Sequence, residues 1–107
     1  MKEILFAFKA NRLLNEDDLK KIENLIEKSN YSIKDKLISI FPNKAKTVVY
    51  VIKESHLIFQ EYPEFNLLLG NLFLCRNEPD SVLIDFCFKL KDILNFEIIS
   101  YHIVNRF

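Results

Sequence analysis

The segment EDDLKKIENLIEKSNYSIKDKLISIF, residues 16–41, carries the clearest secondary-structure pattern in the chain. In its first half, apolar residues from Leu19 to Ile26 recur at the spacing of one helix face, and charged residues occupy the other face. Asn15 is a suitable N-cap, and the three acidic residues after it lie where the helix dipole is positive. The pattern predicts a helix over residues 16–28.

The second half of the segment predicts another helix. Ser32 and Asp35 form an S-x-x-D pattern that is similar to a capping box. An apolar stripe that includes Leu37 follows, and Pro42 marks the end of the helix because proline disfavours helical backbone before it. We therefore expect the whole segment to fold as an αα-hairpin.

The rest of the chain predicts strands and further helices. Residues 3–9, 47–52 and 96–104 are expected to form strands, and residues 65–75 are expected to form a helix. A further helix is expected after a cap at Asp80 or Ser81, with an apolar face from Leu83 to Leu94. Residues 56–62 fit either a hairpin strand or the start of a helix, and Pro63 interrupts both. We expect a single α+β domain over residues 1–107. In it, three or four strands pack against the N-terminal helical hairpin and one or two C-terminal helices.

Composition excludes several classes of protein. Half of the 107 residues are apolar, so the chain can bury a core and is not disordered. Fifteen basic and fifteen acidic residues cancel, which removes the charge signal of a nucleic-acid binder. A single glycine leaves no Gly-rich phosphate loop.

The apolar runs and the cysteines favour a cytoplasmic location. The run Ile4–Phe8 is too short for a signal peptide, and no run reaches the roughly 18 apolar residues of a membrane span. Cys75 and Cys87 lie inside apolar runs, so we expect buried, reduced thiols. These features predict a cytoplasmic protein that does not bind membranes.

Two histidines and two cysteines are the residues most suited to catalysis or metal binding. His56 and His102 are far apart in sequence and flanked by apolar residues, which favours structural roles. With Cys75 and Cys87 they would supply four zinc ligands, but no pair has the short spacing typical of zinc sites. Cys87 lies between two phenylalanines and is expected in the core. We predict no catalytic residue, no metal and no cofactor.

Two alternatives stay open beside this interpretation. A small metal-independent hydrolase or ribonuclease would use His56 or His102 as an acid or base. A helix-turn-helix DNA-binding regulator would use residues 16–41, although the first predicted helix is too acidic to approach phosphates easily. We therefore expect no nucleic-acid partner.

Acidic side chains gather in the second half of the chain. Between residues 55 and 80, Arg76 is the sole basic residue. Carboxylates next to aromatic side chains are typical of a docking surface for a cationic partner. The predicted partner-binding residues are Glu61, Tyr62, Glu64, Phe65, Glu78 and Asp80.

The general profile resembles that of bacterial immunity proteins, which are small, cytosolic, single-domain proteins without catalytic motifs. The resemblance covers size and composition. It implies a protein-binding module, an immunity or antitoxin-type protein, that neutralises a cognate toxin such as a cationic nuclease. On this hypothesis the chain is not an enzyme, and it is a monomer or a homodimer.

Overall fold

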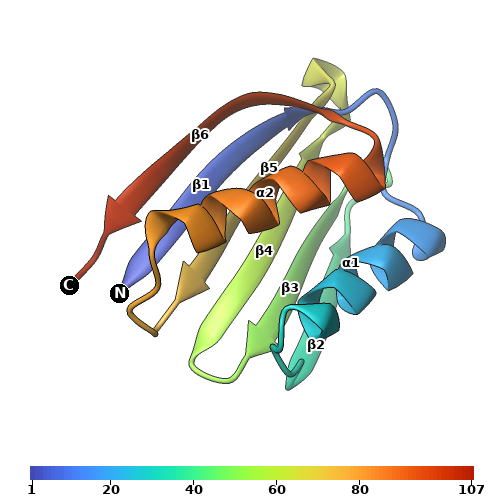
Figure 1. The fold of residues 1–107 in the computed structure, drawn as a ribbon. Coiled ribbons are helices and arrows are strands. Elements are labelled where there is room, and N and C mark those ends of the chain that lie inside the picture. The colour runs from blue at the N-terminus through green and yellow to red at the C-terminus, as the bar shows by residue number, and fades with distance from the viewer.

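Six antiparallel strands form one sheet, and two α-helices lie on the same face of it (Figure 1). The computed structural model describes residues 1–107. The elements in chain order are β1 (Lys2–Lys9), α1 (Glu16–Lys28), β2 (Asp35–Ile40), β3 (Lys46–Ile52), β4 (Ser55–Tyr62), the 3-10 helix η1 (Pro63–Phe65), β5 (Leu67–Leu74), α2 (Asp80–Leu94) and β6 (Glu97–Asn105).

The strand order across the sheet is β2-β3-β4-β5-β1-β6. Strands β2 to β5 follow one another as neighbours, in the same order as in the sequence. β1 then lies between β5 and β6, so the first strand of the chain pairs with the last two. This arrangement leaves β2 and β6 as the two edges of the sheet.

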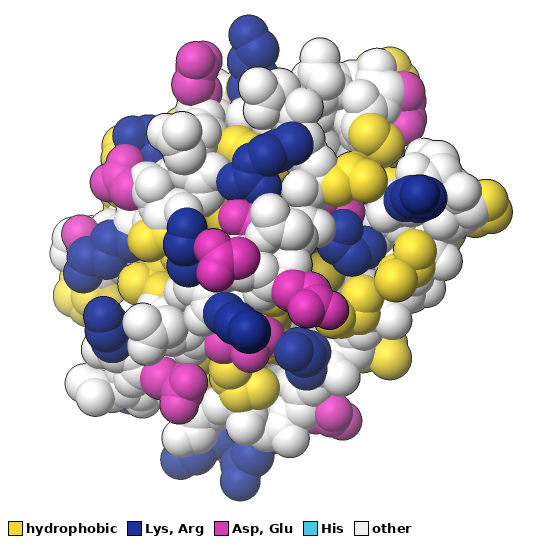
Figure 2. Space-filling model, turned by 90° about the vertical axis from the view of Figure 1, so that its right-hand side faces the viewer, with side chains coloured by type: hydrophobic (Ala, Val, Ile, Leu, Met, Phe, Trp, Pro, Cys, Tyr) yellow, Lys and Arg dark blue, Asp and Glu magenta, His cyan; other side chains and the backbone are white.

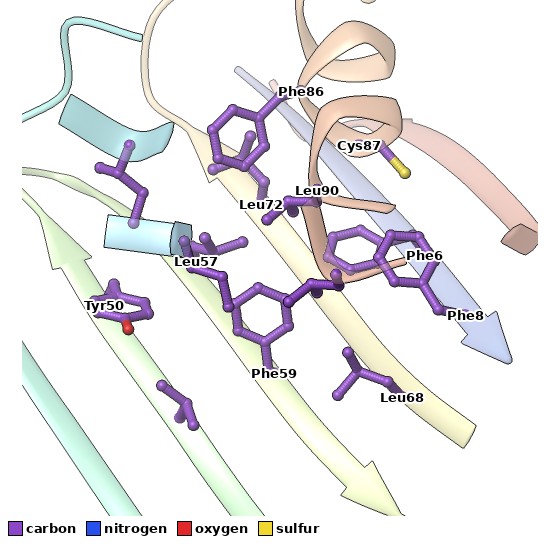
Figure 3. Close-up of a cluster of buried hydrophobic side chains, with 14 of the residues drawn as sticks. Phe6, Phe8, Tyr50, Leu57, Phe59, Leu68, Leu72, Phe86, Cys87 and Leu90 are labelled. Atoms are coloured by element: carbon purple, nitrogen blue, oxygen red, sulfur yellow. The ribbon is translucent and has the colours of Figure 1, made fainter. Parts of the chain in front are cut away.

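The core lies between the sheet and the two helices. Alternate residues of each central strand face the helices, as the period of two in a strand requires. Phe6 and Phe8 stack with ring centroids 4.8 Å apart, and Phe59 meets Phe6 edge to face at 6.0 Å. Phe86 and Leu90 of α2 complete this cluster from above the sheet (Figure 3).

The predicted helix over residues 16–28 is confirmed as α1. Its capping box is reciprocal, because Asn15 Oδ1 accepts a hydrogen bond of 2.9 Å from the Asp18 N–H and an Asp18 carboxylate oxygen accepts one of 2.8 Å from the Asn15 N–H. The Arg12 guanidinium pairs with Asp18 and also donates to the Leu94 carbonyl at 2.9 Å. The start of α1 is thereby joined to the end of α2.

The predicted αα-hairpin over 16–41 is wrong, because its second half forms the edge strand β2. Residues Asp35–Ile40 pair with β3, and this pairing satisfies the outer edge of β3, which a helix would leave open. The apolar stripe that suggested a helix is not buried, since Leu37 is 65% exposed and Ile40 67% exposed. Without a second helix there is no helix-turn-helix unit.

The predicted helix over 65–75 is also wrong, because this segment is strand β5. The single glycine explains part of the difference. Gly70 pairs with Phe6 of β1, and a Cβ at Gly70 would lie 2.3 Å from the Phe6 ring. Gly70 therefore lets an aromatic side chain of β1 lie against the backbone of β5. Residues 56–62, left open by the sequence, form strand β4.

The predicted arrangement of the domain is corrected accordingly. The sheet has six strands rather than three or four, and the helices do not form an N-terminal hairpin. The strands expected over 3–9, 47–52 and 96–104 correspond to β1, β3 and β6, and the helix expected after a cap at Asp80 or Ser81 is α2. No helix in the structure has both the length and the apolar character needed to cross a membrane.

Candidate functional site

A cavity of about 250 Å³ opens where the loop after α1, the β3–β4 turn and the end of β5 meet. The antiparallel pairing of β4 with β5 brings these segments together, because the first residue of β4 lies beside the last residues of β5. The lining residues are Asn30, Tyr31, Ser32, Ile52, Lys53, Glu54, Ser55, Cys75 and Arg76.

Two potential nucleophiles meet in this cavity. Ser55 is the first residue of β4 and is buried, whereas Cys75 directly follows β5 and is partly exposed. The Cys75 N–H donates a hydrogen bond of 3.0 Å to Ser55 Oγ. The Cys75 thiol lies 3.9 Å from a carboxylate oxygen of Glu54. A hydroxyl, a thiol and a carboxyl group therefore share one small volume.

The β3–β4 turn holds Glu54 in this position. Ile52 pairs with Ser55, so Lys53 and Glu54 form a two-residue hairpin connection. Lys53 adopts a left-handed backbone with φ of 54°, a conformation that residues other than glycine adopt infrequently. The tight turn places the Lys53 and Glu54 side chains at the mouth of the cavity.

The opposite wall consists of Tyr31 and Arg76. The Arg76 guanidinium lies over the Tyr31 ring, with Cζ 5.1 Å from the ring centroid, within the range of a cation–π contact. Arg76 Nε also pairs with a Glu78 carboxylate oxygen at 3.3 Å. Tyr31 is itself buried and meets Phe86 of α2 edge to face at 6.4 Å. The guanidinium thus lies against an aromatic ring that is itself packed on the core.

The two histidines do not meet. His56 lies on the helix-free face of the sheet, where its ring stacks on Phe73 at 5.4 Å and its Nε2 lies 3.2 Å from the Asn71 amide nitrogen. His102 is an exposed residue of β6, and strands β5 and β1 separate it from β4. A shared acid–base site of His56 and His102 is excluded by this separation.

The four residues considered as zinc ligands are likewise dispersed. Cys75 lies in the cavity, whereas Cys87 is fully buried in α2, and burial raises the pKa of the Cys87 thiol to about 11. No group of three or more His, Cys, Asp or Glu side chains lies close enough to hold a metal ion.

The predicted docking residues lie at two separate ends of the sheet. Tyr62 is the last residue of β4, and Glu64 and Phe65 lie in η1. Glu78 and Asp80 follow the far end of β5. β5 is eight residues long, which corresponds to roughly 26 Å. The six residues therefore do not form a continuous surface, and the side of the molecule in Figure 2 shows basic and acidic side chains interspersed.

Glu61 is not available to a partner at all. It is 5% exposed and accepts hydrogen bonds from the Leu14 N–H at 2.6 Å and the Lys46 N–H at 2.8 Å. Its carboxylate also pairs with the Lys46 ammonium at 3.0 Å. Glu61 joins the loop before α1 to strand β3, which is a structural role.

Comparison with known proteins gives a similarity of fold. No protein-family model and no curated protein matches the sequence. Among solved structures, the chain is similar to the adenosylmethionine decarboxylase from Aquifex aeolicus VF5, with a TM-score of 0.70 and 13% identity. The similarity covers 97% of this chain and 87% of that chain. At this identity, what the two chains share is the fold.

This comparison overturns the immunity or antitoxin hypothesis. The chain is similar in fold to an adenosylmethionine decarboxylase over almost its whole length, and no finding supports a toxin-neutralising protein. The hypothesis depended on the lack of local sequence motifs. The residues that line the cavity come from three segments that are distant in the sequence, and a search for local motifs does not detect such a cluster.

The sequence interpretation did not single out Ser55, Glu54 or Tyr31. It considered Cys75 as a zinc ligand and as a buried thiol, and the structure shows Cys75 to be partly exposed. One local signal was present. Lys53 and Glu54 are two charged residues between largely apolar runs, which indicates a break between two elements, but neither residue is typical of a two-residue hairpin turn. The hydrogen bond between Ser55 and Cys75 depends in addition on β5 being a strand beside β4.

Proposed function

We propose that this chain is an enzyme that decarboxylates adenosylmethionine or a closely related amino acid at the cavity around Ser55 and Cys75. One observation carries the proposal: a hydroxyl, a thiol and a carboxyl group converge in a cavity of a chain that is similar throughout to a decarboxylase. Groups of this kind in a concave site favour catalysis over passive binding.

The chemistry of decarboxylation fits the residues at this cavity. When an α-amino acid loses CO2, an electron pair is left on Cα, and a carbonyl-type cofactor supplies the group that accepts it. The hydroxyl of Ser55 and the amine of Lys53 are suited to hold such a group, since both line the cavity.

Cα must also receive a proton after CO2 has left. The Cys75 thiol can donate this proton, and Glu54 at 3.9 Å can orient the thiol. The cavity is small and partly walled by Tyr31 and Ile52, which limits the access of water to the reacting atoms. Binding, orientation and proton transfer are therefore assigned to side chains of this chain.

The experiment is to incubate the purified chain with adenosylmethionine that is labelled in its carboxyl carbon, and to measure the CO2 released. We expect release by the native chain, and loss of release in Ser55→Ala and Cys75→Ala. Cys87→Ala is the matched control, because it removes the other thiol, which lies outside the cavity. Absence of release both alone and with added carbonyl cofactor contradicts the proposal.

A cytoplasmic location is part of the proposal. It is supported by two free cysteines, which are typical of proteins in a reducing compartment.

A further inference from the structure

Arg76 differs from the other two arginines in how its guanidinium is used. Both terminal nitrogens of Arg12 are occupied, by Asp18 and by the Leu94 carbonyl. Arg106 lies over Phe73, and its Nη1 pairs with Glu3 at 3.5 Å. Arg76 uses only Nε, towards Glu78, and neither of its Nη atoms has a hydrogen-bond partner in the chain.

The surroundings of Arg76 fix its orientation and leave this pair of donors accessible. Tyr31 supports the flat face of the guanidinium, and Glu78 holds it from the Nε side. The side chain is 55% exposed and lies at the edge of the cavity that contains Ser55 and Cys75. A guanidinium held in this way offers two parallel N–H donors, the geometry that binds a carboxylate through both oxygens.

We propose that Arg76 binds the carboxylate of the substrate and thereby selects ligands that carry one. This rests on the proposed function, since it takes the substrate to be an amino acid of the adenosylmethionine type. The charged residues that line the cavity are Lys53, Glu54 and Arg76, so two basic groups stand against one acidic group and their balance favours an anionic ligand.

The chemistry of the reaction determines which kinetic parameter Arg76 controls. The carboxylate loses its charge as it becomes CO2, so its contact with Arg76 weakens towards the transition state. An interaction that stabilises the bound substrate more than the transition state lowers KM without raising kcat. Arg76→Gln should therefore raise KM and leave kcat equal or higher.

The test is to measure the binding of two ligands by calorimetry: adenosylmethionine, and the same molecule without its carboxylate. We expect Arg76→Gln to weaken binding of adenosylmethionine by about tenfold or more, in line with loss of a charge-assisted hydrogen-bond pair. Binding of the decarboxylated ligand should stay unchanged. Arg76→Lys should fall between native and Arg76→Gln, because an ammonium keeps the charge but not the paired donors. Arg106→Gln is the matched control, an arginine stacked on another aromatic ring outside the cavity.

Two results would overturn the inference: equal losses for both ligands, or no loss for either in Arg76→Gln. If the native chain binds neither ligand, the proposed function fails and the anion site is tested separately. Acetate is then titrated while the Arg76 Nε–H resonance is followed by NMR. A saturable shift in the native chain supports a carboxylate site at Arg76, and its absence rejects the site. Melting curves of each variant establish that it is folded.

Discussion

The backbone N–H of Cys75 donates a hydrogen bond of 3.0 Å to Ser55 Oγ. This bond joins the residue after β5 to the first residue of β4, beyond the last pair of the β4–β5 ladder. It also places the serine hydroxyl and the cysteine backbone in one small volume at the cavity. The stability of the sheet end and the geometry of the candidate site therefore depend on the same contact.

Replacement of Ser55 by alanine should lower the free energy of unfolding by about 1–2 kcal/mol, because the partly buried Cys75 N–H loses its acceptor. Urea denaturation measures the change. Ser100→Ala is the control, since Ser100 is exposed on β6 and its replacement should change stability by less than about 0.5 kcal/mol. Equal stability of Ser55→Ala and the native chain would show that the bond contributes nothing.

Replacement of Gly70 by alanine should destabilise the protein by about 1–3 kcal/mol, the usual cost of overpacking a core. The added Cβ would lie 2.3 Å from the Phe6 ring, so the ring must move. A double-mutant cycle with Phe6→Leu measures the coupling of the two positions. We expect Gly70→Ala to cost less in the Phe6→Leu background, and an unchanged cost would mean that another neighbour is responsible.

The ion pair of Asp18 with Arg12 should make stability depend on acid pH. Burial alone would raise the pKa of Asp18, but hydrogen bonds from Arg12 and from the Asn15 N–H hold this pKa below its ordinary value. A carboxyl with a lower pKa in the folded chain stabilises the fold above the unfolded pKa of about 4. This stabilisation is lost as the pH falls through the folded-state pKa.

Asp18→Asn should therefore be less stable than the native chain at pH 6, by about 1–3 kcal/mol for hydrogen bonds to a charged group. The gap should begin to narrow as the pH falls below about 4, where Asp18 of the unfolded chain becomes protonated, and it should be smallest below the lowered pKa of Asp18 in the folded chain. Urea denaturation at a series of pH values gives both quantities. A constant gap between pH 6 and pH 2 would contradict the assignment.

The two thiols should differ in reactivity. Cys75 is partly exposed at the cavity, whereas Cys87 is fully buried and burial raises its pKa to about 11. Because the thiolate is the reactive form, a colorimetric thiol reagent at pH 8 should modify one thiol in the native protein and two after denaturation. Cys75→Ser should abolish the rapid reaction. Two rapid reactions in the native chain would show that α2 opens readily.

Leu37 and Leu90 provide a comparison between an exposed and a buried leucine. Leu90 is fully buried in α2, so Leu90→Ala should cost about 2–5 kcal/mol. Leu37 is 65% exposed on β2, so Leu37→Ala should change the free energy of unfolding by less than about 0.5 kcal/mol. Denaturation curves of the two variants check this, and similar costs would mean that the exposed edge is covered in solution.

The elements that could be predicted from the sequence are those with local signals. α1 has a reciprocal cap at Asn15 and a single apolar face, and both are properties of neighbouring residues. β2 and β5 could not be predicted in this way, because apolar residues there also fit helical spacing. Their conformation is determined by pairing with other strands. β2 pairs with β3, and β5 pairs with β4 and with β1, which is distant in sequence.

The candidate site could not be predicted for a related reason. Tyr31, Ser55 and Cys75 have no motif spacing, and they meet because antiparallel strands and the loop after α1 end at the same place. The oligomeric state stays a prediction, since the fold of one chain does not determine it.

The position of β1 between β5 and β6 also has a consequence for how the chain reaches its fold. During synthesis β1 leaves the ribosome first, but its partners Leu67–Leu74 and Glu97–Asn105 are made last. The β2–β4 meander can form as soon as residue 62 has emerged, whereas β1 has no partner until β5 emerges and keeps its other edge unpaired until β6 emerges. Long-range pairing of this kind slows folding and exposes apolar strands to aggregation. The residues Ile4, Phe6 and Phe8, which are buried in the folded protein, are therefore exposed while translation continues. A chaperone that binds β1 during this time would protect the chain from aggregation.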